Sequence, residues 1–254
     1  MWDLVILNPM INFLLWIYSI LGQNFGLAII VFTILVNLLL YPLNAQQMKS
    51  TQAMQEMQKS KKWQDIQKKY KDDREKLAQE QMKFYKEMGI SPFGSCLPML
   101  IQFPLIIGLY QAVTRALAVT PVQLLDLSRH VYSFINAPSL IPLNSRFLWM
   151  ELSQPERLYV FGVGVPVLTI LVVITTYLSS KLMTPPPSGP KDQSAQMARS
   201  MNMIMPLMMG MFAYQFSAGL AIYLLAGNLF RIVQYALMGK TNWKNLLPGS
   251  KASS

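Results

Sequence analysis

Cysteine and histidine are scarce in this sequence of 254 residues, and each shortage excludes a class of function. The single cysteine, Cys96, excludes internal disulfides and thiolate-rich metal sites. The single histidine, His130, leaves no ordinary zinc site and no histidine-based catalytic pair. The apolar segments also lack a nucleophile with a base, so we expect no cofactor, no metal and no enzyme.

Charged residues are also few, and they are unevenly placed. They make up 13% of the chain against 52% hydrophobic residues. Of the 22 basic and 12 acidic residues, 18 lie between Lys49 and Glu87. This distribution excludes a single water-soluble core, and it excludes an intrinsically disordered chain.

Long uncharged runs account for most of the remaining sequence. A bilayer core about 30 Å thick needs roughly 20 apolar helical residues. The runs of that length are Leu4–Leu43, interrupted at 22–26, then Gly89–Thr114, Leu158–Ser180 and Ser200–Phe230. As one helix the last would be roughly 46 Å long, so it predicts two short spans with a turn near Ser217–Gly219. The sequence predicts an all-α polytopic membrane protein with five transmembrane helices, an N-terminal interfacial helix and a cytoplasmic helical hairpin.

The predicted organisation follows from these runs and the polar segments between them. In chain order it is 1–22 interfacial helix, 23–44 first span, 45–88 charged helical hairpin, 89–115 second span, 116–157 external segment, 158–180 third span, 181–200 cytoplasmic loop, 201–238 fourth and fifth spans as a hairpin, and 239–254 cytoplasmic tail. Strong helix formers dominate 45–88, and we expect its turn at 71–74. Residues recur at helical spacing in two stripes, which are Trp63, Ile66 and Tyr70 before the turn and Leu77, Gln81, Phe84 and Met88 after it.

The basic residues predict the orientation. The segments 45–88, 181–199 and 231–254 hold 18 of the 22, whereas 1–44 holds none. The positive-inside rule then places these segments and the C-terminus in the cytoplasm, and the N-terminus outside the cell membrane.

The first apolar run, Leu4–Leu21, has three interpretations. It is long enough for a sixth span, and it is compatible with the core of a signal peptide, although no basic residue precedes it. As a span it would place an N-terminus without Lys or Arg in the cytoplasm. Asn8, Pro9, Asn12 and two tryptophans favour the third interpretation, a helix in the outer membrane interface.

Polar side chains inside the spans indicate a candidate site. At helical spacing several share a face of their helix, as Thr33 and Asn37 do on the first span. One interpretation is a shared hydrated cavity, and the other is ordinary hydrogen bonding between packed helices. The candidate residues are Thr33, Asn37, Asn44, Ser95, Gln102, Thr169, Thr176, Gln215 and Asn228.

Four segments resemble one known family. Ser91-Pro-Phe-Gly-Ser-Cys-Leu-Pro-Met-Leu-Ile-Gln-Phe-Pro-Leu-Ile-Ile-Gly-Leu-Tyr110 is similar to the second span of the YidC/Oxa/Albino family of membrane-protein insertases. The segments Gly26–Ile30 and Leu38–Leu43 resemble its first span. Met205-Pro206 and Phe216–Tyr223, followed by Asn228, resemble its closing pair of helices. The resemblance covers about 20–238 in the expected order.

This resemblance implies a hydrophilic groove open to cytoplasm and lipid, with substrates passing along the second and fourth spans. The residues expected to form an apolar slide are Met201, Met205, Met208, Met209 and Phe212, whose flexible thioethers suit varied segments, although such methionines also serve simple packing. The implied partners are newly made membrane proteins, with a ribosome, a targeting factor, a Sec-type translocon and anionic lipid as further candidates. No sequence-specific nucleic-acid binding is implied.

One position departs from the family pattern. Bacterial members usually carry an arginine five residues before the proline that corresponds to Pro42, and this sequence has Asn37 there. Asparagine retains hydrogen bonding but removes the long-range attraction for acidic segments. A transporter or channel is the alternative function, although the spans contain no acid for proton coupling and no internal repeat.

Overall fold

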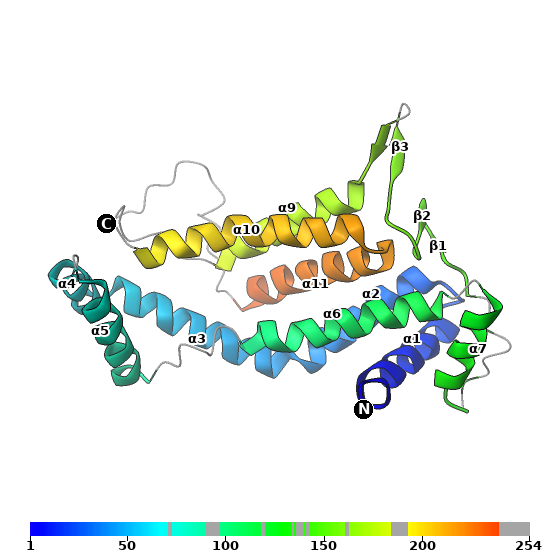
Figure 1. The fold of residues 1–254 in the computed structure, drawn as a ribbon, viewed down its shortest axis with the longest axis horizontal. Helices are drawn as coiled ribbons and strands as arrows, with labels where there is room; N and C mark the ends of the chain where they lie inside the picture. Colours follow the sequence, from blue (N-terminus) through cyan, green and yellow to red (C-terminus); the bar gives the residue numbers. More distant parts are fainter. Residues whose placement is uncertain are drawn as a thin grey trace.

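Helices form most of the computed structural model (Figure 1). The structure describes residues 1–70, 73–89, 97–117, 120–133, 135, 140, 143–160, 163–183 and 193–238. Its helices are η1 (Asp3–Leu7, a π-helix), α1 (Asn8–Ile20), α2 (Phe25–Leu39), α3 (Tyr41–Lys59), α4 (Lys61–Lys69), α5 (Arg74–Glu87), α6 (Leu97–Ala116), α7 (Pro121–His130), α9 (Val167–Met183), α10 (Gln193–Gln215) and α11 (Ala218–Leu237). Its strands form two antiparallel hairpins, β1 (Arg146–Phe147) with β2 (Met150–Glu151) and β3 (Leu158–Val160) with β4 (Val163–Val165).

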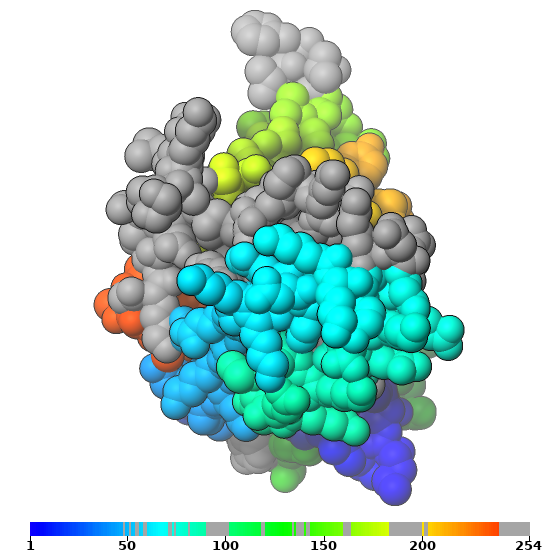
Figure 2. Space-filling model, turned by 90° about the vertical axis from the view of Figure 1, so that its left-hand side faces the viewer, coloured from blue at the N-terminus to red at the C-terminus, as the bar shows by residue number. Residues whose placement is uncertain are grey.

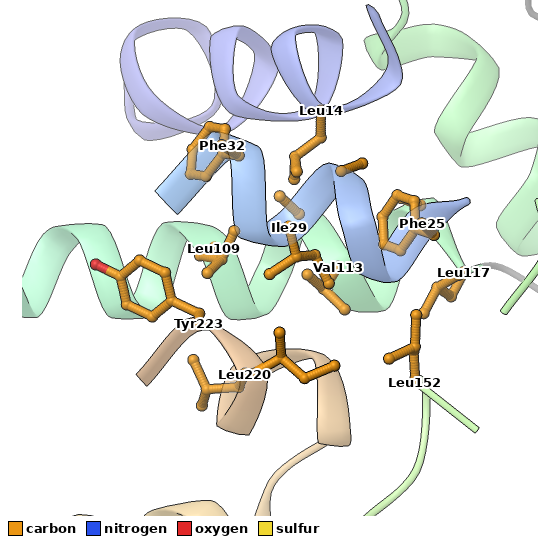
Figure 3. Packing of buried hydrophobic residues seen from close by; sticks show 14 of the residues in the cluster. Leu14, Phe25, Ile29, Phe32, Leu109, Val113, Leu117, Leu152, Leu220 and Tyr223 are labelled. Carbon is orange, nitrogen blue, oxygen red and sulfur yellow. The ribbon is translucent and has the colours of Figure 1, made fainter. Parts of the chain in front are cut away.

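The main core lies where α1, α2, α6 and α11 meet (Figure 3). Leu14, Ile29, Val113 and Leu220 come from these four helices, and each is at most 1% exposed. Small residues let the backbones approach: a Cβ on Gly219 of α11 would lie 2.8 Å from Cγ1 of Val113. Between helices in a membrane, such close van der Waals packing is a main source of association.

Several helices are candidates for membrane spans by their length and apolar composition. Within the described residues, Asp3–Ile20 and Ala218–Leu237 are long and apolar enough to cross a bilayer, and the bent pair Phe25–Leu39 and Tyr41–Gln47 is a third candidate. Val167–Leu182 and Met203–Gln215 are shorter apolar helices. The helical membrane-protein class is confirmed, while the count of five spans stays a prediction. The alternative of a span at the start of the chain stays open, because η1 and α1 meet the length criterion.

The first span is bent by 60° between α2 and α3, whereas the sequence predicted one piece over 23–44. The break follows from Pro42, in the first turn of α3. Proline has no backbone N–H, and its ring would clash with the carbonyl four residues earlier in a continuous helix. Helix α3 then continues to Lys59, so residues 45–59 extend this helix and are not part of a two-helix hairpin.

The charged hairpin consists of α4 and α5, and it lies at the opposite end of the molecule from α7 and the β-hairpins (Figure 1). Ser60 caps α4 through the Trp63 backbone N–H, and Asp73 caps α5 through that of Lys76. This hydrogen bond from the Lys76 backbone holds the pKa of the Asp73 carboxyl below its usual range. Figure 2 views the molecule onto this end, where α4 and α5 cover much of the front.

The hairpin has its own small core. The Trp63 ring is buried and stacks on Phe84 with 6.4 Å between ring centroids. Ile66 and Leu77 pack against this core as predicted, but Met88 is 49% exposed and contributes nothing to it. Met57 at the end of α3 supplies a buried contact that the predicted stripes did not include.

Residues 158–160 and 163–165 form the paired strands β3 and β4, so the prediction that the third span begins at 158 was wrong. Helix α9 begins at Val167, after Pro166. The buried Glu156 carboxylate accepts the Leu168 backbone N–H at 3.0 Å and the Trp149 Nε1–H at 3.0 Å. It therefore satisfies a donor in the first turn of α9 that has no partner within the helix.

Glycine at position 210 sets the approach of α10 to α9. A Cβ there would lie 2.4 Å from Cγ2 of Val173, a stiff β-branched side chain, whereas a Cβ on Gly227 would have no atom nearer than 3.9 Å. We predict that Gly210→Ala lowers the free energy of unfolding by about 1–3 kcal/mol through overpacking. The control Gly227→Ala should be neutral or stabilising by up to about 1 kcal/mol, since alanine favours helix. Thermal unfolding in detergent micelles measures both, and equal effects would contradict this account.

Candidate functional site

The side chain of Gln102 joins α6 to α11 through two hydrogen bonds. Its Nε2 donates to the Tyr223 hydroxyl at 2.8 Å, and its Oε1 accepts from Nη2 of Arg231 at 2.9 Å. Tyr223 is buried, while Gln102 and Arg231 are half-buried. These three residues, here called the Gln102 cluster, place a positive charge and an amide between helices that are otherwise apolar.

Thr33 and Asn37 on α2 are buried and bond within their own helix. The Thr33 hydroxyl donates to the Ile29 carbonyl at 2.6 Å, and Asn37 Nδ2 donates to the Thr33 carbonyl at 2.8 Å. Both polar groups are therefore satisfied without a partner from another helix. The two residues share a face of α2, as the sequence predicted. That face is buried in the structure, because Asn37 is 7% exposed and Thr33 is 0% exposed.

Helix α2 runs parallel to α11 at this place. Two glycines mark the approach, because a Cβ on Gly219 would lie 3.2 Å from Cδ1 of Ile29, and one on Gly227 would lie 3.9 Å from Cγ2 of Thr33. Asn37 lies one turn beyond Thr33, and Arg231 lies one turn beyond Gly227. Counted from the Gly227–Thr33 contact, Arg231 therefore lies near the level of Asn37 on the neighbouring helix.

A second polar cluster joins α9 to α11. Asn228 Nδ2 donates to the hydroxyls of Thr176 at 2.7 Å and of Thr175 at 3.3 Å. The Thr176 hydroxyl in turn donates to the Val172 carbonyl at 2.7 Å. This geometry is that of hydrogen bonding between packed helices, the second interpretation considered for these residues.

The other predicted groove residues lie apart from both clusters. Asn44 lies beyond the bend, on α3, so it no longer shares the face of Thr33 and Asn37. Gln215 is exposed at the end of α10, and Thr169 is half-buried on α9. Ser95 lies outside the described residues.

The exposed apolar face of α10 differs from the predicted slide. Met205, Met208, Met209 and Phe212 are half-buried, and the side chain of Met201 lies outside those described. Met209 packs against the main core. The side chains that stand out from this helix instead are Met203, Ile204, Leu207 and Met211, at 69%, 60%, 63% and 53% exposure.

Tyr223, Arg231 and Thr175 are site residues that the sequence analysis did not select. Two of them, Arg231 and Tyr223, could have been selected from the sequence. Arg231 is the one charged residue of α11, and a buried tyrosine hydroxyl normally finds a hydrogen-bond partner. Thr175 was not selected because helical spacing places it away from the face that Thr169 and Thr176 share.

These observations define a helical membrane protein with a partly accessible polar cluster between its helices. The family model described as 60Kd inner membrane protein matches residues 16–245. The chain therefore belongs to the 60Kd inner membrane protein family.

Several relatives are named as insertases. The chain is 34% identical over 245 residues to the membrane protein insertase YidC of Oceanobacillus iheyensis, an alignment of 94% of this chain and 84% of the relative. It is 34% identical to MisCA of Bacillus subtilis over 93% of this chain and 78% of the relative. With YidC of Clostridium tetani it shares 35% identity over 94% and 95% of the two chains.

A solved structure agrees with these relatives. It is titled as an active YidC insertase with the first transmembrane domain resolved, and it matches with a TM-score of 0.56 at 26% identity. The match covers 91% of this chain and 44% of the solved chain, so this chain spans less than half of that protein. The resemblance stated from the sequence is confirmed, and the chain is a member of a family of membrane-protein insertases.

The hydrogen bond between Asn228 and Thr176 predicts a stability effect. Thr176→Val keeps the shape of the side chain but removes an acceptor, so we expect a loss of about 1 kcal/mol in the free energy of unfolding. Thr169→Val on the same face of α9 is the matched control, because the structure gives Thr169 no side-chain hydrogen bond within the residues it describes. Unfolding in mixed micelles measures the difference, and a larger loss for Thr169→Val would refute the assignment.

Proposed function

We propose that this chain inserts transmembrane segments into the lipid bilayer through a hydrophilic groove formed around the Gln102 cluster. The relatives supply the activity, and the Gln102 cluster is the observation that carries the site. Gln102 and Arg231 are only half-buried, so an incoming chain or water can reach polar groups inside an apolar bundle. Polar groups at such depth are costly unless they face protein or water, which favours a functional reason for them.

The physical account needs neither a nucleotide nor a catalytic nucleophile. A hydrated groove lowers the cost of moving a polar segment partway into the bilayer, since its amides keep hydrogen-bond partners. The following apolar segment then gains free energy as it leaves water for lipid. The protein lowers a barrier and forms no covalent bond, so we propose that it is not an enzyme.

We place the substrate path between α6 and α10. The exposed apolar face of α10, with Leu207 and Met211, offers a surface for an apolar segment leaving the groove. This face replaces the predicted slide residues, which pack inward to a larger extent. The polar end of the path is the Gln102 cluster on α6 and α11.

The partners follow from this activity. Newly made membrane proteins are the substrates, and a ribosome, a targeting factor or a Sec-type translocon would deliver them at the cytoplasmic face. Helices α4 and α5 are rich in lysine and arginine. The α4–α5 hairpin is therefore the proposed docking element for these partners and for anionic lipid. A solute transporter is not favoured, because the named relatives are insertases.

The proposed orientation in the cell membrane puts the α4–α5 hairpin inside and the β-hairpins outside. In a Cys96→Ala background, Leu148→Cys should react with a membrane-impermeant maleimide added to intact cells, while Lys76→Cys should react only after lysis. Both sites are well exposed, at 74% for Leu148 and 66% for the Lys76 side chain, so accessibility in the protein does not bias the comparison. External labelling at Lys76 would overturn the orientation.

Substitutions of Asn37 test whether the neighbourhood of the Gln102 cluster is hydrated. Asn37→Leu should dry it and reduce insertion of single-span substrates with polar or acidic translocated segments, with little effect on strongly apolar ones. Asn37→Arg should be tolerated, because its charge would reach water in a hydrated groove, whereas a dry interface would bury an unpaired charge.

The assay is insertion in cells depleted of the native protein, with abundance as the folding control. A misfolded Asn37→Arg protein together with a fully active Asn37→Leu protein would reduce Asn37 to a packing residue. That outcome would also remove α2 from the proposed groove.

A further inference from the structure

The β3–β4 hairpin is an apolar element that stands away from the main core. Its sequence, Leu158-Tyr-Val-Phe-Gly-Val-Gly-Val165, contains no charged residue. The side chain of Tyr159 is 70% exposed. Figure 1 shows the hairpin extending across the direction of α9 and α10. An exposed apolar element of this kind indicates contact with something other than bulk water.

The open edges of the hairpin limit how deep it can lie in a membrane. Among the described residues, β3 and β4 pair only with each other, so the outer edge of each strand presents backbone groups without a partner strand. Hydrocarbon offers these groups no hydrogen bond, which excludes the bilayer core. The headgroup region suits both parts of the hairpin, because water reaches the backbone there and acyl chains lie close to the apolar side chains.

The connection to α9 places the hairpin at that depth. Strand β4 ends at Val165, and α9 begins two residues later at Val167. Helix α9 is apolar, and its side chains Ile170 and Ile174 are 46% and 54% exposed. Such a helix surface faces lipid in a membrane protein. The hairpin therefore lies where α9 enters the bilayer.

A positive charge lies beside the hairpin, at Arg157. Its guanidinium carbon is 5.8 Å from the centre of the Tyr214 ring, at the end of α10. A Cβ on Gly164 would lie 3.5 Å from Cε1 of Tyr159 and 3.8 Å from Cβ of Arg157, so both side chains flank the same glycine. The charge and two exposed tyrosines thus gather at one level of the molecule. Tyrosines are enriched at this level in membrane proteins.

The charge of Arg157 is not neutralised by a neighbouring acid. The carboxylate of Glu156, the adjacent residue, accepts hydrogen bonds from Trp149 Nε1 and from the Leu168 backbone N–H. Within the part of the chain that the structure describes, no ion pair involves Arg157. A guanidinium offers several N–H donors in a planar fork, and this fork matches the oxygens of a phosphate.

We propose that the β3–β4 hairpin is an arm that lies in the lipid headgroup region, and that Arg157, held on the Tyr214 ring, binds the phosphate of an anionic phospholipid. The lipid belongs to the leaflet where α9 begins, which is the outer leaflet in the proposed orientation. The arm fixes the depth of α9. It also fixes that of α10, because Gly210 lets α10 pack closely on α9.

The depth of the arm is measured with nitroxide labels on the full chain in phospholipid nanodiscs. In a Cys96→Ala background, single cysteines replace Tyr159, Ile174 as the lipid reference and Lys76 as the water reference. Collisions of each label with oxygen, which concentrates in lipid, are compared with collisions with a nickel chelate, which stays in water. The ratio at position 159 should lie between the two references.

Two results of this measurement would overturn the arm. A ratio at position 159 equal to that at position 76 would place the hairpin in water. Few collisions with either reagent would show that protein covers the hairpin in place of lipid.

The lipid site is tested by raising the fraction of phosphatidylglycerol in phosphatidylcholine nanodiscs while the label at position 159 is read. Arg157→Gln should raise the fraction that gives half of the change about fivefold, the equivalent of about 1 kcal/mol. Tyr214→Leu keeps the charge but removes the ring, and should raise it about twofold.

Arg129→Gln is the matched control, because it removes the same charge from an exposed position of α7, at the same end of the molecule (Figure 1). It should leave the half-change fraction of phosphatidylglycerol unaltered. Equal effects of Arg129→Gln and Arg157→Gln would show a general attraction of the surface for anionic lipid and would overturn the site. An unaltered half-change fraction in Arg157→Gln would overturn it as well.

Discussion

The hydrogen bonds of Gln102 are the interaction on which the functional arrangement depends. In an apolar bundle a carboxamide needs partners, and this one finds a donor and an acceptor on the same neighbouring helix. One partner, the Tyr223 hydroxyl, lies in the buried part of α11. The other, the Arg231 guanidinium, belongs to a half-buried residue nearer the end of that helix. One side chain therefore packs α6 against α11 and fixes the direction of a charge.

The apolar core sets the frame for this cluster. Gly219 lets α11 approach Val113 of α6 and Ile29 of α2, and these contacts hold the three helices close together. The bend at Pro42 then turns α3 away from the bundle, so the charged α4–α5 hairpin lies at one end. Activity and docking are thus assigned to separate parts of the chain.

The sequence predicted those features that depend on local chemistry. Uncharged runs predicted α2, α11 and the turn at Ser217, and helix formers with spaced apolar residues predicted the helices on which Trp63 and Phe84 lie. It did not predict features that depend on contacts between distant residues. The β3–β4 hairpin was taken into the third span because an apolar run does not distinguish strand from helix. Gln102 was selected, but its partners Tyr223 and Arg231 come from a helix more than a hundred residues away, and no local spacing reports that register.

The central claim is that substrates pass beside the Gln102 cluster, and site-specific photocrosslinking tests it most directly. A photoreactive residue would replace Phe103, which adjoins Gln102 and is 41% exposed, or Leu109 on the same helix, where the side chain is 0% exposed. A third probe at Val122 on α7, which is 78% exposed, reports non-specific contact. During arrested insertion of a single-span substrate, we predict cross-links from position 103 and none from 109 or 122. Cross-links from 122 with none from 103 would contradict the account.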